Sequence, residues 1–199
     1  VPADVMTLDA AKELFYDAPL GGQTCDGTLY GFPAEYNIEY GGAYVNPAIF
    51  ETAGVAYPHA WENWDAVLAD AKKMTVLGSD GVMTIAGLHY TNSDQLFTYF
   101  LAGILEQNGN YFAEDGKHFN FNSPEAIATI QKLMDMTQKD GVVDPIIFNA
   151  DSEWVGDSFA QGHNAIGVLG SWYAGDAKIG YPDLKFDYVP LPPMMGSEH

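Results

Sequence analysis

The chain has 199 residues, 47% of them apolar, which suffices for one good-sized globular domain and argues against disorder. Its charge is strongly negative, because 27 acidic side chains face only 8 basic ones and give a formal net charge of −19. Such a surface repels phosphate backbones and anionic lipids, so nucleic-acid binding and peripheral membrane attachment are disfavoured. The single cysteine, Cys25, excludes an intramolecular disulfide and a cysteine-rich metal framework.

No stretch approaches the ~20 consecutive apolar residues of a membrane span, and residues 1–4 lack the basic and apolar regions of a signal peptide. The two ends of the sequence resemble neither a natural start nor a natural end. The protein is therefore either cytoplasmic or a processed or excised piece of a longer one, and its ends lead us to expect a fragment.

The first third of the chain predicts a helix, two strands and a second helix. Thr7 is expected to cap the first helix, and residues 28–33 have the β-branched and aromatic content of a strand. Residues 43–45 form a second extended piece, after which Asn46 can cap a helix that has Pro47 at its first position.

Between these two strands, the segment 35–42 combines acidic and aromatic side chains. It is predicted to be a binding segment or a hinge.

The middle of the chain contains the clearest helical pattern, residues 61–74, whose tryptophans are expected in the core. Residues 83–88 then predict a buried strand, and residues 92–95 have the spacing of a capping box for the next helix. A hairpin is expected over residues 111–121, and Ser123 is expected to cap the helix that follows it.

The last third predicts a helix over residues 151–161 with Trp154 on its apolar face, a buried strand over 165–169 and a final strand over 186–191. Strands and helices thus alternate along the chain. This order predicts a layered α/β fold with a mostly parallel sheet.

The most informative stretch is residues 162–172, which runs from a helix end through a buried strand to Trp172 on a glycine-rich turn. Open α/β sheets bind ligands just beyond the carboxyl ends of their strands. Trp172 is therefore predicted to face a binding cleft, with an ordinary core position as the alternative.

The sequence contains little evidence of catalytic or cofactor-binding motifs. The chain has no glycine-rich loop with a lysine for phosphates, and the order of residues 167–171 does not match Gly-x-Ser-x-Gly; Ser171 is also followed by Trp172 rather than by a helix start. The five histidines lack the spacing of a metal-binding face. We expect neither metal nor cofactor, and the sequence singles out no carboxylate pair for glycoside hydrolysis.

What remains is recognition of a neutral, hydroxyl-rich ligand. Aromatic faces cover the apolar C–H surface of such a ligand, while carboxylates and amides bond its hydroxyls. Asp94 and Gln95 have helix capping as an alternative role, and Glu35 could be a solvated charge. The candidate binding residues are Glu35, Tyr36, Glu39, Tyr40, Asp94, Gln95, Tyr99, Trp172 and Tyr173.

The order of motifs resembles the extracellular solute-binding proteins of sugar-type ABC importers. The resemblance extends from about Asp26 to Pro192 and rests on these segments in order: residues 26–33, 44–54, 61–64, 108–109, 122–126, 159–162, 170–172 and 190–192. It implies the periplasmic-binding-protein type II fold, of which this chain would supply mainly the C-terminal lobe. Residues 1–43 would be the tail of the N-terminal lobe and the first hinge crossing, 44–186 the C-terminal α/β lobe, and 187–199 the second crossing.

The resemblance also implies a function and a place of action. Trp172 matches the family's stacking aromatic, residues 35–40 the segment that reaches the cleft, and residues 94–99 the helix start that supplies polar contacts. The expected protein is a monomeric, noncatalytic receptor that delivers a mono- or oligosaccharide to the membrane subunits of an ABC permease. It would be periplasmic or extracellular, with or without a lipid anchor. The alternatives are the same fold with an amino acid, polyamine or metal chelate as ligand, and a glycoside-active enzyme.

Overall fold

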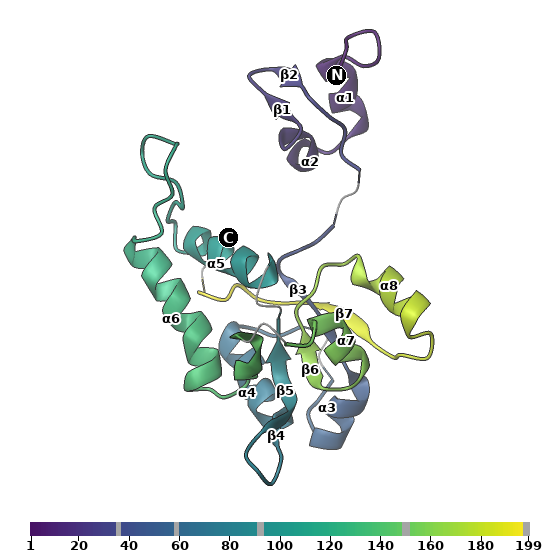
Figure 1. Cartoon of the computed structure of the whole chain (residues 1–199), viewed down its shortest axis with the longest axis vertical. Coiled ribbons are helices and arrows are strands. Elements are labelled where there is room, and N and C mark those ends of the chain that lie inside the picture. Colours follow the sequence, from purple (N-terminus) through teal and green to yellow (C-terminus); the bar gives the residue numbers. More distant parts are fainter. Residues whose placement is uncertain (35–36, 58–59, 91–93, 149–151, 197–199) are drawn as a thin grey trace. The chain divides into compact units, whose positions relative to one another are not determined.

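The computed structural model describes residues 1–34, 37–57, 60–90, 94–148 and 152–196 (Figure 1). The chain divides into two compact units, Val1–Asn37 and Ile38–His199, which are described separately below. Within the described residues, we find no helix whose length and apolar content would allow it to span a bilayer.

The first unit contains two short helices and a hairpin. Helix α1 (Leu8–Leu14) is capped as predicted, because the Thr7 hydroxyl accepts a hydrogen bond from the Ala10 amide at 3.2 Å. Helix α2 (Asp17–Gly21) follows, and β1 (Thr24–Cys25) pairs antiparallel with β2 (Thr28–Leu29). The strand is shorter than the predicted 28–33. A small core closes the unit, formed by Ala11, Leu20 and Leu29.

The second unit is built on one sheet with the strand order β4-β5-β6-β3-β7. The strands are β3 (Gly42–Val45), β4 (Val76–Leu77), β5 (Met83–His89), β6 (Asn164–Gly167) and β7 (Asp187–Pro190). Among the described strands, β5 and β6 run parallel, whereas β4–β5, β3–β6 and β3–β7 are antiparallel. The prediction of a mostly parallel sheet is therefore wrong. Strand β4 reaches β5 through a short turn, which forces antiparallel pairing, and alternation along the sequence does not fix strand direction.

The helices after Asn46 and Ser123 begin where local signals predict them, whereas the helix predicted over 151–161 begins at Val155. The capping box predicted over 92–95 lies partly outside the described residues. The Asn46 carboxamide accepts from the Ala48 amide at 3.1 Å, and Ser123 Oγ accepts from the Ala126 amide at 3.1 Å. The helix predicted over 61–74 begins at Trp64 instead, because Asn63 caps it. The helices of this unit are α3 (Pro47–Ala53), α4 (Trp64–Met74), α5 (Asp94–Glu106), α6 (Pro124–Gln138), the 3-10 turn η1 (Pro145–Phe148), α7 (Val155–Ala160) and α8 (Tyr173–Gly180).

Helix α8 was not predicted, because the sequence contains no helix start signal after Ser171. Its N-cap residue is Trp172, and within the described part of the chain no side chain caps the helix, so the usual start signal is missing. Trp172 lies on a turn, as predicted, and this turn leads directly into α8.

Helical layers cover both faces of the sheet (Figure 1). Side chains alternate between faces along a strand, and β3 shows the division. Ala43 and Val45 belong to a large core cluster with residues of α3 to α6, whereas Tyr44 belongs to a second cluster with residues of α7 and α8. The predicted α/β class is confirmed.

Candidate functional site

The candidate site lies where the parallel strands end. Strands β5 and β6 end at His89 and Gly167, and the chain then turns through residues 170–174 into α8. Tyr44 on β3 anchors this turn: its hydroxyl accepts from the Ala174 amide at 2.9 Å and donates to the Ser171 carbonyl at 3.0 Å. Burial, with a smaller contribution from Glu39, raises the pKa of Tyr44, so its hydroxyl stays protonated. The turn that carries Trp172 is thus fixed to the sheet.

The segment that precedes β3 is bound to the same turn. The Ile38 amide donates to Ser171 Oγ at 3.0 Å, and the Ser171 amide donates to the Ile38 carbonyl at 2.9 Å. Next to this pair, a Cβ placed on Gly170 would overlap both Glu39 Oε2 and Trp172 Nε1. Glycine at this position therefore lets a carboxylate and an indole edge approach the same point. The structure brings together Glu39 and Trp172, two of the predicted site residues.

A second tryptophan, which the sequence analysis did not assign to the site, stacks on the first. Trp154 is the N-cap residue of α7, and its ring lies 6.0 Å from the Trp172 ring at an interplanar angle of 13°. The Trp154 indole lies against Gly156, where a Cβ would overlap its six-membered ring. The sequence contains a hint of this contact, namely a glycine two residues after a tryptophan at a helix start.

Tyr173 is predicted as a ligand contact, but the structure buries it at 1% exposure beneath the two tryptophans. Its ring stands nearly perpendicular to Trp154 and Trp172, at 79° and 90°. Its hydroxyl donates to the Gly156 carbonyl at 2.5 Å, and burial raises its pKa. Tyr173 thus joins α7 and α8 below the tryptophan pair.

The remaining predicted residues lie elsewhere or outside the description. Tyr99 and Gln95 on α5 are buried, at 2% and 4% exposure, and the Tyr99 ring contacts Tyr40 at 4.7 Å. Tyr40 packs against the large core cluster rather than joining the tryptophan pair. Residues Glu35 and Tyr36 lie outside the described residues, as does the side chain of Asp94.

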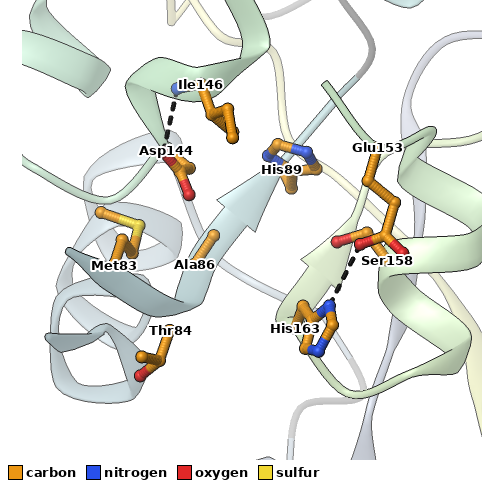
Figure 2. Close-up of a pocket in the computed structure, with 9 residues that line it drawn as sticks. All are labelled: Met83, Thr84, Ala86, His89, Asp144, Ile146, Glu153, Ser158 and His163. Carbon is orange, nitrogen blue, oxygen red and sulfur yellow. Dashed lines mark hydrogen bonds and ion pairs between the residues drawn. The ribbon is translucent and has the colours of Figure 1, made fainter. Parts of the chain in front are cut away.

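A separate pocket of about 250 Å³ opens beside β5, η1 and α7 (Figure 2). His89, at the end of β5, lies between Ile146 and Glu153 (Figure 2). Burial lowers the pKa of His89 to about 4, although Asp144 and Glu153 act in the opposite direction. Glu153 is already paired with His163, whose Nδ1 lies 3.0 Å from its Oε2. Of the predicted site residues that the structure describes, none lines this pocket, and the same part of the chain contains no group of three metal-ligating side chains.

The fold places a pair of stacked tryptophans, Trp154 and Trp172, near the carboxyl ends of two parallel strands. The chain belongs to the bacterial extracellular solute-binding protein family, whose model matches residues 1–196. The family predicted from the sequence motifs is confirmed. One relative is a protein of Brucella abortus (strain 2308) named as a binding protein, which is 25% identical over 192 residues, or 96% of this chain and 44% of the relative. The chain thus spans less than half the length of that relative.

Solved structures share the fold at low sequence identity. T. maritima MalE3 bound to maltose matches 96% of this chain and 48% of its own, with a TM-score of 0.68 and 21% identity. An ABC transporter solute-binding protein from Thermotoga lettingae TMO, bound to α-D-tagatose, matches 94% of this chain and 47% of its own, at TM-score 0.69 and 18% identity. UgpB from M. tuberculosis, in complex with glycerophosphocholine, matches 89% of this chain and 43% of its own, with a TM-score of 0.63 and 18% identity. These matches confirm the predicted fold, the periplasmic-binding-protein type II fold.

Proposed function

We propose that this chain forms the carbohydrate-binding lobe of a substrate receptor that serves an ABC importer. The observation that carries this proposal is the platform of Trp172 and Trp154 beside the Glu39 carboxylate, at the carboxyl ends of the parallel strands. The sugar-bound solved structures of the same fold support this ligand class.

The chemistry of the platform suits a sugar ring. One face of a pyranose is covered by C–H groups, which stack on an indole, while its hydroxyls point outward and donate to carboxylates. The Trp172 indole supplies the first kind of contact and Glu39 the second. The Tyr44 hydroxyl and the Ile38–Ser171 pair hold both residues in place before a ligand arrives.

The domain limits and the mode of action belong to the same proposal. Residues 1–43 would complete the other lobe and lead into the first crossing, 44–186 would form this lobe, and 187–199 the second crossing. Hinge closure would trap the sugar between lobes and present the closed receptor to the permease. The receptor would act without catalysis, as a monomer, in the periplasm or outside the cell.

A cationic ligand is the second candidate, because a carboxylate beside two indoles also suits an ammonium group. The two candidates differ in their response to salt. A charged ligand in a carboxylate-lined site should lose affinity steeply as salt rises, whereas a neutral sugar should not.

The test is thermal unfolding of the full-length protein against mono- and oligosaccharides, polyamines and amino acids. A ligand at about 100 times its Kd should stabilise the protein by roughly 2.7 kcal/mol and raise the midpoint visibly. We expect a shift with one sugar class that is lost in Trp172→Ala. A shift with polyamines or amino acids alone would overturn the sugar assignment, and turnover of an oligosaccharide would overturn the noncatalytic role.

A further inference from the structure

The two indoles of the tryptophan pair overlap only in part. Carbon atoms of rings in contact lie about 3.5–4.0 Å apart, so two nearly parallel rings with centroids at 6.0 Å must be displaced sideways. Each indole therefore keeps a part that the other does not overlap. Trp154 is 38% exposed, and Trp172 is only partly buried.

The buried Tyr173 side chain supports the tryptophan pair from the protein interior. The centroid of the Tyr173 ring lies 5.6 Å from that of Trp154 and 6.4 Å from that of Trp172, and the Tyr173 ring is nearly perpendicular to both. Its hydroxyl is bonded to Gly156, the residue against which the Trp154 indole lies. Aromatic side chains that are already fixed in place lose little conformational entropy when a ligand binds, so little of the free energy gained from contact with them is lost.

The polar groups are distributed unequally between the two tryptophans. Trp172 has the Glu39 carboxylate beside its indole nitrogen. The carboxylate next to Trp154 in sequence, Glu153, is already engaged, since its two oxygens meet Gln161 Nε2 at 2.5 Å and His163 Nδ1 at 3.0 Å. The Trp172 end of the platform thus has a carboxylate beside its indole, whereas the Trp154 end offers mainly an aromatic surface.

We propose that Trp154 is a specificity-determining residue that selects a saccharide of at least two consecutive rings. The inference rests on the proposed function and deepens it. The first ring stacks on Trp172 and bonds Glu39, and the second ring extends over the exposed part of Trp154. A monosaccharide fills the Trp172 end and leaves Trp154 uncovered.

The experiment is isothermal titration of the full-length receptor with a monosaccharide and with the di- and trisaccharide built from it, chosen from the sugar class that stabilises the protein. Wild type should bind the disaccharide at least about tenfold more tightly than the monosaccharide, the effect of about 1.4 kcal/mol. Trp154→Ala should remove about that factor for the disaccharide and change monosaccharide affinity less than about twofold. Trp172→Ala should weaken both.

Two further variants separate a ligand contact from support of Trp172. Trp154→Phe keeps an aromatic ring and should retain most of the disaccharide preference, whereas Trp154→Leu keeps apolar contact with Trp172 and should lose it. Phe119→Ala, which truncates an aromatic residue that is 62% exposed and lies outside the tryptophan pair, is the matched control and should change neither affinity. Wild type should show an exciton signal of the paired indoles in circular dichroism, and Trp154→Ala should lose it without loss of folding.

The outcomes distinguish the two proposals. If Trp154→Ala weakens monosaccharide and disaccharide equally, Trp154 only supports Trp172 and the inference is wrong. If it weakens neither, Trp154 lies outside the ligand's reach and the inference is equally wrong. If wild type binds no carbohydrate, the proposed function itself fails, and the inference fails with it.

Discussion

Acidification should destabilise the second unit through one buried histidine. His89 ends β5 at 4% exposure, and its buried Nδ1 has no hydrogen-bond partner among the described residues. Burial lowers its pKa from 6.5 to about 4. In the unfolded chain the imidazole takes up a proton near its ordinary pKa, so between these two values the unfolded state binds more protons than the folded state.

The sign and size follow from this difference. The stability that neutral His89 contributes is fully present above pH 6.5, falls as the pH drops, and is lost by about pH 4. The difference between a pKa of 6.5 in the unfolded chain and about 4 in the folded protein corresponds to about 3 kcal/mol of unfolding free energy. That is a large fraction of the stability of a typical domain.

The assay is urea-induced unfolding across this pH range in wild type and in His89→Gln, which stays neutral throughout. Fluorescence follows the second unit specifically, because Trp61, Trp64, Trp154 and Trp172 all lie within it. The many carboxylates titrate in both proteins, so they cancel in the difference between the two curves. That difference should change by about 3 kcal/mol between neutral pH and pH 4. Parallel curves would refute the account of His89.

Three substitutions test how the site is built. Tyr44→Phe leaves the Ala174 amide without its acceptor, so it should cost about 1–3 kcal/mol in urea unfolding and weaken ligand binding at the turn; an unchanged affinity would speak against the anchoring role. Gly170→Ala places a methyl group against the Glu39 and Trp172 side chains and should weaken ligand binding in calorimetry, whereas Gly175→Ala, with open space around its Cβ, is the matched control and should bind normally. Gly87→Ala would drive a Cβ into a carbonyl of α4 and should lower the unfolding free energy by at least about 1–3 kcal/mol; a wild-type urea midpoint would contradict the close strand–helix packing.

Features set by neighbouring residues could be predicted from the sequence. The start of α3 needs only Asn46, followed by proline, and its end needs Gly54 at a φ of 67°, a conformation that glycine adopts without strain. Strand directions depend instead on which strands meet in space. The sequence contains no local signal that β3 runs against both β6 and β7.

In the candidate site too, local features could be predicted and contacts between distant segments could not. The position of Trp172 shortly after a buried strand could be predicted, because the strand and the glycine-rich turn after it are local signals. Its contact with a ligand stays a prediction. Its stacking partner Trp154 lies 18 positions earlier and is brought to it only by the packing of α7 on α8. Tyr173 follows Trp172 in the sequence yet points under the platform, since the helix start after residue 172 turns consecutive side chains in different directions.

The most direct test of the proposed function is a crystal structure of the full-length protein with the sugar that raises its unfolding midpoint most. We expect a sugar ring stacked on the Trp172 indole, with one of its hydroxyls bonded to the Glu39 carboxylate. A sugar bound elsewhere, such as in the pocket beside His89, with Trp172 left uncovered, would contradict the account.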